Sequence, residues 1–417
     1  MNPPHDTTND RSTTSRADLV CLSHLRWNFV FQRPQHLMTR FASERRVFFV
    51  EEPIFDSTRP QLKIRRDGDV RVVVPHLPAG MTAQSVNDTL TTLLTDMCVE
   101  WSIAKPICWY YTPMALSYAR WLDAGAVVYD CMDELAAFKG APPELLTLEQ
   151  ELLDHADVVF TGGHSLWEAK RGRHPRVYAF PSSVDVAHFS KARRAAADPP
   201  DQAGIPHPRM GFFGVIDERM DIDLIAAIAE AKPDWQLVML GPCVKIAESS
   251  LPRPGNIHYL GIKKYEDLPA YLAGWDVALL PFAMNESTRF ISPTKTPEYL
   301  AAGRPVVSTP VRDVVRPYGE SGMVAIASTP AEFCSAIARA LGDPDPEWRA
   351  RVDRYLTTLS WDRTWADMRT LCEDAIRQRA RAARAETSRR VHLAFADRRS
   401  AARPAGPAAP SMGRADV

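Results

Sequence analysis

The sequence predicts an α/β protein built from two doubly wound domains, each with a parallel sheet covered by helices on both faces. Short apolar runs with little polar alternation recur along the chain, and helical stretches separate them, which is typical of buried parallel strands. A charged, proline-rich segment divides these runs into two series. At 417 residues the chain is also longer than one hydrophobic core usually serves.

The first series predicts a domain over residues 17–190. Amphipathic stretches such as 35–42 and 144–155 lie between its strands. A polar segment, residues 1–16, precedes it; we expect this segment to be disordered, and it lacks the apolar core of a secretory signal. The strand candidates are 18–23, 46–51, 70–75, 107–112, 126–130, 158–161 and 177–180.

The second series predicts a domain over residues 209–345. A linker, 191–208, joins it to the first; it has four prolines and no apolar periodicity. Residues 346–378 are predicted to be helical. The strand candidates are 210–216, 236–240, 257–260, 277–281, 305–309 and 323–327, and the helices include 223–230, 267–273 and 331–341. Since ligands bind beyond the carboxyl ends of such strands, we expect the site in a cleft where the two domains face each other.

Composition places the chain among water-soluble globular proteins, with 45% hydrophobic and 24% charged residues. No apolar run approaches the roughly 20 residues that a membrane-spanning helix needs. The seven cysteines are scattered without paired spacing, which argues against a zinc site and a disulfide framework. We therefore expect a cytoplasmic protein.

Residues 379–417 are predicted to form a disordered tail rich in arginine, alanine and proline. From Arg377 to the end, ten arginines face three acidic residues, a local net charge of +7 against a formal total of −1. Such a tail either lies on anionic lipid headgroups at the inner face of a membrane or is a solvated extension. We expect no nucleic-acid partner.

The segment from Arg289 to Val307 carries the strongest functional signal. Thr296 and Pro297 suit the start of a short helix, where unpaired N–H groups and the charge of Lys295 favour a diphosphate. Glu298 in the first turn can accept two hydroxyl hydrogen bonds, as from a ribose. Together these features indicate a nucleotide, although an ordinary loop, helix and strand would show the same residue types.

Glycines follow two strands of the second domain at the predicted ligand-binding edge. Gly214 and Gly241 allow a ligand to approach the backbone, and Arg219 is a nearby cation for a diphosphate. The neighbouring acidic residues lack the spacing of a calcium loop, so we expect no metal.

The first domain supplies candidates for catalysis and for acceptor binding. Asp130 ends a strand and Asp133 follows it, where carboxylates can act as general bases, although either could instead be a helix N-cap. His164, after the next strand, could donate to a sugar or phosphate oxygen or be structural. The segment after the first strand offers donors for an anionic or polyhydroxylated ligand: Arg26, Trp27, Gln32 and Arg33.

The chain resembles bacterial glycosyltransferases of the GT-B fold, most closely family 4 and its relatives. The resemblance covers roughly residues 18–376 and rests on ordered motifs, among them Pro181-Ser182-Ser183-Val184-Asp185, Asp276 to Pro281 and Glu298 to Val307. The sequence departs from the family at Phe290, where a second glutamate is usual, and at Val215, where an arginine is usual.

The resemblance implies two Rossmann-like domains facing across a cleft, with a C-terminal helix crossing back to the first domain. It implies a nucleotide-sugar donor bound mainly by the second domain, with Glu298 on the ribose, and a glycan or lipid-linked acceptor bound mainly by the first. Catalysis is expected from Asp130, Asp133 and Lys295, without cofactor or metal and with retention of configuration. The implied donor-binding residues are Gly214, Arg219, Gly241, Ser292, Thr294, Lys295, Thr296 and Glu298.

Three functions follow from this resemblance. The first is transfer of a sugar in surface polysaccharide biosynthesis. The alternatives are a non-catalytic nucleotide- or glycan-binding relative, suggested by Phe290 and Val215, and a nucleotide-sugar epimerase on the same scaffold.

Overall fold

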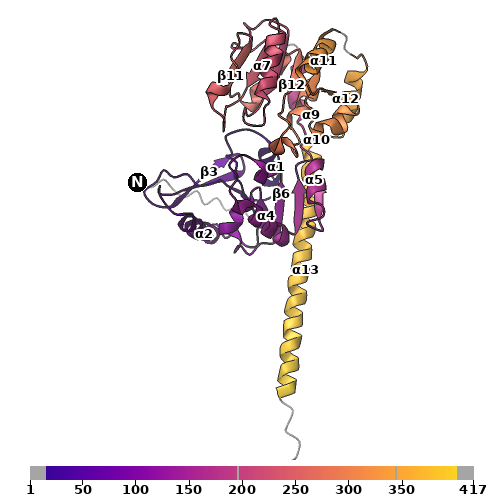
Figure 1. Ribbon diagram of the computed structural model, residues 1–417. Helices are drawn as coiled ribbons and strands as arrows, with labels where there is room; N and C mark the ends of the chain where they lie inside the picture. The colour runs from indigo at the N-terminus through magenta and orange to yellow at the C-terminus, as the bar shows by residue number, and fades with distance from the viewer. Residues whose placement is uncertain (1–15, 195–196, 343–344, 402–417) are drawn as a thin grey trace, which may run out of the picture.

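The structure, a computed structural model, describes residues 16–194, 197–342 and 345–401, with side chains as far as residue 390. Two sheets, each covered by helices, form two domains (Figure 1). The first sheet has the strand order β3-β4-β2-β1-β5-β6-β7-β8 and the second the order β11-β10-β9-β12-β13-β14. Every neighbouring pair is parallel except β3 with β4. The predicted α/β class with two doubly wound domains is confirmed.

The elements of the first domain follow the predicted alternation of strand and helix. They are β1 (Leu19–Leu22), α1 (Arg33–Ala42), β2 (Val47–Val50), β3 (Gln61–Asp67), β4 (Val70–His76), α2 (Ala83–Glu100), β5 (Ile107–Tyr110), α3 (Leu116–Ala119), β6 (Ala126–Cys131), α4 (Glu144–His155), β7 (Val158–Thr161), α5 (His164–Lys170) and β8 (Val177–Ala179).

The second domain begins after α6 (Val186–Phe189) and an irregular connection. Its elements are β9 (Arg209–Phe213), α7 (Ile222–Ala231), β10 (Gln236–Leu240), β11 (Ile257–Gly261), α8 (Leu268–Ala273), β12 (Val277–Leu280), α9 (Lys295–Ala301), β13 (Val306–Ser308), α10 (Arg312–Val314), β14 (Ala325–Ile326) and α11 (Pro330–Gly342), followed by α12 (Trp348–Leu356) and α13 (Trp361–Ala401).

The central strands are buried on both faces, which explains why their sequences do not alternate. Each residue of β1, β2, β5, β6 and β7 is buried, as is each residue of β9 and β12. Each sheet therefore separates two apolar clusters, one on each face.

The edge strand β3 is absent from the predicted strands. It pairs antiparallel with β4 across a turn at Gly68, with Gln61 opposite His76 and Asp67 opposite Val70. Its residues are half-buried or exposed, and its outward positions carry charge. A strand of this kind gives a weak apolar signal because only one face of it packs.

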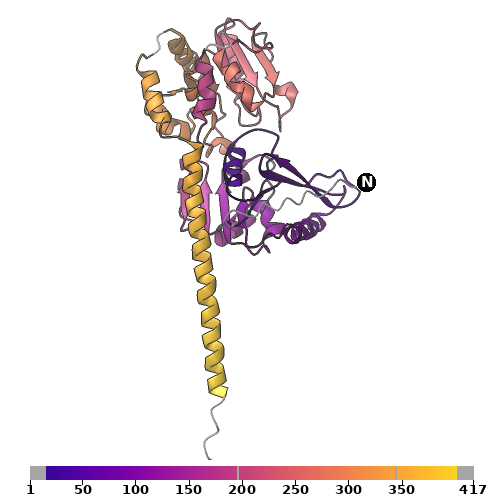
Figure 2. The ribbon, with the colours of Figure 1, turned by 180° about the vertical axis from the view of Figure 1, so that it is seen from behind.

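Helix α13 first crosses back over the first domain, as the resemblance implied (Figures 1 and 2). Trp361, Met368 and Cys372 are buried with strand residues of the first sheet, and Arg369 pairs with Glu44. These contacts tie the end of the second domain to the first.

Beyond this contact the structure corrects the predicted disordered tail. Helix α13 continues to Ala401, so residues 379–401 are helical. Arg379 still pairs with Asp157 of the first domain, and Arg384 lies beside Lys105, whereas the end of the helix projects away from the body. Residues 402–417 lie outside the described part. Alanine and arginine are strong helix formers, a preference that outweighs the polar composition. No helix within the described ranges combines the length and apolar character that crossing a bilayer requires.

Candidate functional site

The two domains face each other at the carboxyl ends of their strands. In the first sheet β1 lies between β2 and β5, and in the second β9 lies between β10 and β12, so the strand order reverses beside β1 and beside β9. Such reversals leave the crevice in which α/β proteins bind ligands. Six residues at these edges, four from loops and two from the first turn of α9, form what we call the interdomain cluster: Asp133, Gly214, Asp217, Arg219, Lys295 and Glu298.

Close packing of two glycine turns shapes the floor of this cluster. Gly214 and Gly241 have φ of +137° and +136°, values that L side chains rarely adopt. A methyl group on Gly214 would lie 2.1 Å from Lys295 Cε, and one on Gly241 would lie 1.8 Å from the Gly214 carbonyl oxygen. The absence of both side chains thus lets Lys295 lie directly over the end of β9.

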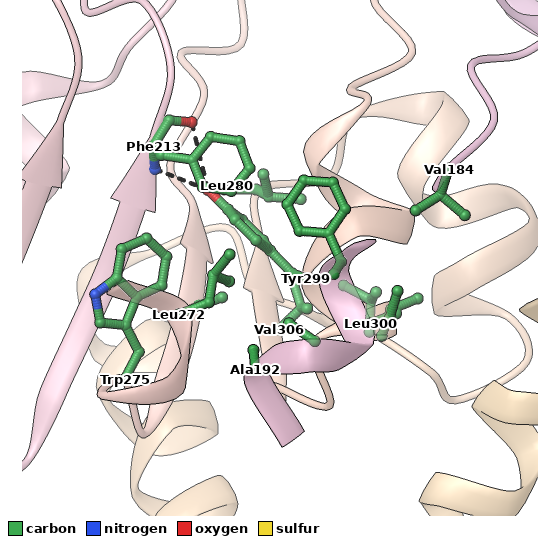
Figure 3. Packing of buried hydrophobic residues seen from close by; sticks show 14 of the residues in the cluster. Val184, Ala192, Phe213, Leu272, Trp275, Leu280, Tyr299, Leu300 and Val306 are labelled. Atoms are coloured by element: carbon green, nitrogen blue, oxygen red, sulfur yellow. Dashed lines mark hydrogen bonds between the residues drawn. The ribbon is translucent and has the colours of Figure 1, made fainter. Parts of the chain in front are cut away.

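A buried tyrosine fixes helix α9 to that strand end (Figure 3). The backbone N–H of Phe213, the last residue of β9, donates to the Tyr299 hydroxyl over 2.9 Å. The Tyr299 ring packs edge-on against Phe213 and Trp275 inside the apolar core. Lys295 and Glu298 are on the same helix, so the hydrogen bond and the core packing of Tyr299 position both side chains.

Helix α9 begins two residues earlier than predicted, since Thr296 was expected as its N-cap and Pro297 as its first residue. Lys295 is its first residue, and the Thr296 N–H donates to the Pro293 carbonyl oxygen over 3.1 Å. Thr296 is therefore not the N-cap; its hydroxyl is buried and has no partner within the described residues. Thr294 occupies the cap position, but its side chain makes no capping bond.

Glu298 and Lys295 lie in an unfavourable setting for charge. Glu298 is 7% exposed, and its Oε2 atom makes no hydrogen bond to any described residue. Burial raises the pKa of Glu298 to about 8, against the opposing charge of Lys295. Burial, and then Arg219, lower the pKa of Lys295 to about 8. A carboxylate kept dry with a free oxygen is suited to accept hydroxyl groups of a ligand.

Arg219 reaches the cluster but already has a partner. Its guanidinium makes three hydrogen bonds to the Asp217 carboxylate, the shortest being 2.7 Å from Nη2 to Oδ2. Phe138 of the first domain lies 5.4 Å from the Arg219 guanidinium and 5.0 Å from Lys245 Nζ. Phe138 and Lys245 carry no sequence signal for this site, because only the packing of one domain against the other brings them together.

The structure separates the two predicted catalytic aspartates. Asp133 is partly buried; burial raises its pKa, whereas the charges of Arg219 and Lys295 lower it. Asp130 is fully buried and pairs with Arg33, whose Nη2 lies 2.8 Å from Oδ1. Arg33 also donates to the Phe180 carbonyl oxygen over 2.7 Å. The predictions of Asp130 as a catalytic residue and Arg33 as an acceptor ligand are therefore wrong, since neither side chain is open to a substrate.

The other predicted acceptor residues differ in exposure. Trp27 is wrongly predicted: it is 6% exposed, packs on Phe49 in the core and uses its N–H groups within the domain. Arg26 is held by Glu51 and by backbone carbonyls. Gln32 is half-buried before α1, and His164 is exposed at the start of α5.

Two residues outside the predictions also lie where the domains meet. Asp313 of the second domain accepts the Ser165 N–H of α5 over 2.9 Å, directly beside Gly163 and Ser292. His24 follows β1, and burial lowers its pKa to about 4. Its Nδ1 is buried without a partner in the described part of the chain. His24 could have been predicted as a site residue from the sequence, because it is a polar residue directly after the first strand.

Comparison with known proteins agrees with this geometry. Residues 207–343 match the family described as "Glycosyl transferases group 1". A Bacillus subtilis (strain 168) protein described as "Putative teichuronic acid biosynthesis glycosyltransferase TuaH" is 26% identical over 298 residues, which span 66% of this chain and 73% of that protein.

Solved structures show the same fold at low sequence identity. Sucrose-phosphate synthase from Thermosynechococcus elongatus superposes with a TM-score of 0.65 at 16% identity, covering 86% of this chain and 99% of that one. Alpha,alpha-trehalose 6-phosphate synthase from Burkholderia multivorans gives 0.61 at 16% identity, covering 89% and 100%. A structure described as "Trehalose-6-phosphate from E. coli bound with UDP-2-fluoro glucose" superposes with a TM-score of 0.59 at 14% identity, covering 85% of this chain and 98% of that one. These matches confirm the predicted two-domain fold.

Proposed function

We propose that this chain, a glycosyltransferase of the GT-B fold, transfers a sugar from a nucleotide-sugar donor to a glycan or lipid-linked glycan acceptor. The observation that carries the proposal is the buried Glu298 carboxylate, whose Oε2 has no partner among the described residues. It lies on the same helix as Lys295, which packs against the Gly214 turn. The teichuronic acid relative supports a role in surface polysaccharide assembly.

The second domain would hold the donor. Glu298 would accept ribose hydroxyls, and the open backbone at Gly214 and Gly241 would admit the diphosphate beside Lys295. The solved relative with a bound UDP-sugar supports a nucleotide diphosphate sugar as the ligand class. Ser292 and Thr294 precede Lys295 on the same loop and would line the sugar-phosphate end.

Transfer would depend on charge stabilisation at the departing diphosphate. Lys295 and Arg219 would stabilise the negative charge that develops on the diphosphate. Asp133 would orient the acceptor hydroxyl toward the donor sugar. Phe138, which faces Arg219 and Lys245, would bring the first domain onto the donor. Independence from metal and retention of configuration remain predictions of the resemblance.

The chain would work in the cytoplasm, with its basic helix at the membrane. On the C-terminal part of α13 the side chains of Arg381, Arg384 and Arg389 are exposed, and anionic headgroups would attract them. Such contact would bring a lipid-linked acceptor to the interdomain cluster.

A non-catalytic relative is the competing function, favoured by the pairing of Arg219 with Asp217 and by Phe290 in the position of a family glutamate. Calorimetry with uridine, guanosine and adenosine diphosphates identifies the nucleoside first. Product analysis with donor alone and with donor plus acceptor then distinguishes transfer from isomerisation and from binding without turnover.

Replacing Lys295 with alanine tests the site itself. We expect turnover to fall on the order of 100-fold because a preorganised charge at the leaving group is lost. Lys232→Ala is the matched control, since Lys232 is exposed before β10, at the opposite edge of the same sheet. Turnover of Lys295→Ala within threefold of the control would remove Lys295 from the mechanism.

A further inference from the structure

The contact between α10 of the second domain and α5 of the first centres on Gly163. This glycine follows the turn after β7 and occupies the N-cap position of α5, with φ of −164° and ψ of 170°. These are extended values that any residue can adopt, so the local backbone does not require a glycine. The reason for the missing side chain lies outside the first domain.

The second domain supplies that reason. A Cβ atom on Gly163 would lie 2.1 Å from Asp313 Oδ2 and 2.7 Å from Ser292 Cβ. Apart from the glycine's chain neighbours, the three atoms nearest to such a Cβ all belong to the second domain. Gly162 differs, because its Cβ would meet the backbone of Met132 in its own domain. The glycine at position 163 is therefore needed only for the closed arrangement, in which α10 lies against α5.

Asp313 takes the role of the missing cap. A polar N-cap side chain normally accepts the N–H of the second or third residue of its helix. Gly163 has no side chain to do so, and the N–H of Ser165, the second residue of α5, instead donates to Asp313 Oδ1 over 2.9 Å. The neighbouring Arg312 pairs with Glu168 on the same helix. Two consecutive residues of α10 thus bind α5 across the domain boundary.

Helix α10 is fixed in the second domain, next to the loop that leads into α9. Val311 and Val314, which lie on either side of Arg312 and its neighbour, are buried in the core of that domain. Ser292, which also meets the glycine, lies on the loop that leads into Lys295. The closed contact therefore holds this loop, and Lys295 with it, against the first domain.

We propose that Asp313 is a positioning residue for sugar transfer: by capping α5 from the opposite domain, it holds the two domains closed around the interdomain cluster. The inference rests on the transferase class of the chain and on no particular donor. When the domains separate, the Ser165 N–H loses its acceptor, because the first N–H groups of a helix have no partner within it. Hydrogen exchange at this amide therefore reports on closure.

Gly163→Ala tests the inference without removing a polar group. Because the new methyl group would collide with the second domain, we expect the Ser165 amide to exchange faster, on the order of 10-fold or more. The radius of gyration from small-angle X-ray scattering should rise as well. The Arg171 amide, which donates to the Trp167 carbonyl oxygen over 2.8 Å at the end of α5, should exchange at the wild-type rate.

Gly172→Ala provides the matched control in the same domain. Gly172 follows α5, and a Cβ atom there would meet nothing within 4 Å. This substitution should leave the exchange at Ser165 and the radius of gyration unchanged. If Gly163→Ala behaves like this control, the inference fails.

Two substitutions of Asp313 test the hydrogen bond itself. Asp313→Ala removes the acceptor and should reproduce both changes, whereas Asp313→Asn keeps a carbonyl oxygen for the Ser165 N–H and should stay close to the wild type. Wild-type exchange at Ser165 as fast as in Asp313→Ala would overturn the inference, and so would an asparagine variant that behaves like the alanine variant.

The radius of gyration distinguishes positioning from simple capping. If exchange at Ser165 rises in Gly163→Ala and Asp313→Ala while the radius of gyration stays at the wild-type value, Asp313 caps α5 without holding the domains, and the inference fails. None of these measurements requires a nucleotide. A wild type that binds no nucleoside diphosphate would therefore remove the proposed donor and leave this test intact.

Discussion

Replacing Glu298 with glutamine should stabilise the ligand-free protein at neutral and alkaline pH while it weakens donor binding. Glu298 is 7% exposed, has an unpartnered oxygen and has a pKa raised to about 8. A buried carboxylate of this kind must either carry an unfavourable charge or take up a proton. Glutamine has nearly the same shape and requires neither.

The pH dependence follows from the direction of the shift. Because the folded pKa is raised, the folded protein keeps a proton that the unfolded chain releases above the ordinary value of 4.5. Compared with the glutamine variant, the wild type therefore loses free energy of unfolding as the pH rises from about 4.5 to about 8. Above that pH the difference between the two proteins stays constant. At pH 7.5 the full shift would correspond to an upper limit of about 4 kcal/mol. Since burying the glutamine amide has a cost of its own, we expect the variant to gain about 1–3 kcal/mol.

Urea unfolding at pH 5 and pH 8 measures this difference, and calorimetry measures nucleotide affinity. Glu286→Gln is the control: Glu286 lies on the surface of the preceding loop, paired with Arg289, and should change stability by less than about 0.5 kcal/mol. A Glu298→Gln variant that is less stable than wild type at pH 8 would refute the reasoning. So would one with the same pH dependence.

Two further substitutions separate structural from catalytic roles. Asp130→Ala leaves the Arg33 guanidinium buried without its carboxylate partner and should lower the free energy of unfolding in urea by about 3–5 kcal/mol. Adding Arg33→Met should recover part of this loss. If Asp130→Ala instead has normal stability but no turnover, Asp130 is a catalytic residue after all. Tyr299→Phe leaves the buried Phe213 N–H unpaired and should cost about 1–3 kcal/mol, with weaker nucleotide binding because α9 loses its anchor. Nucleotide binding by Tyr299→Phe at wild-type affinity would show that the bond does not position α9.

Local sequence was sufficient to predict the strands of the two sheets, with the exception of β3. A strand buried on both faces is apolar at most or all positions, so β1, β2 and β12 can be recognised from four residues each. The edge strand β3 needs to be apolar on one face only, which is why its signal was missed. The glycines at positions 214 and 241 were also predictable as close-approach positions, because the absence of a side chain is a local property.

Only the tertiary structure decided which polar residues are free to act. Asp130 and Asp133 lie three positions apart and look alike in sequence, but Asp130 is neutralised by Arg33, 97 residues away, and Asp133 is not. The buried carboxylate of Glu298, whose Oε2 has no partner among the described residues, arises where separate segments of the chain pack together. Burial and pairing depend on contacts between distant segments, so the sequence named the candidate residue types and the packing of the two domains selected among them.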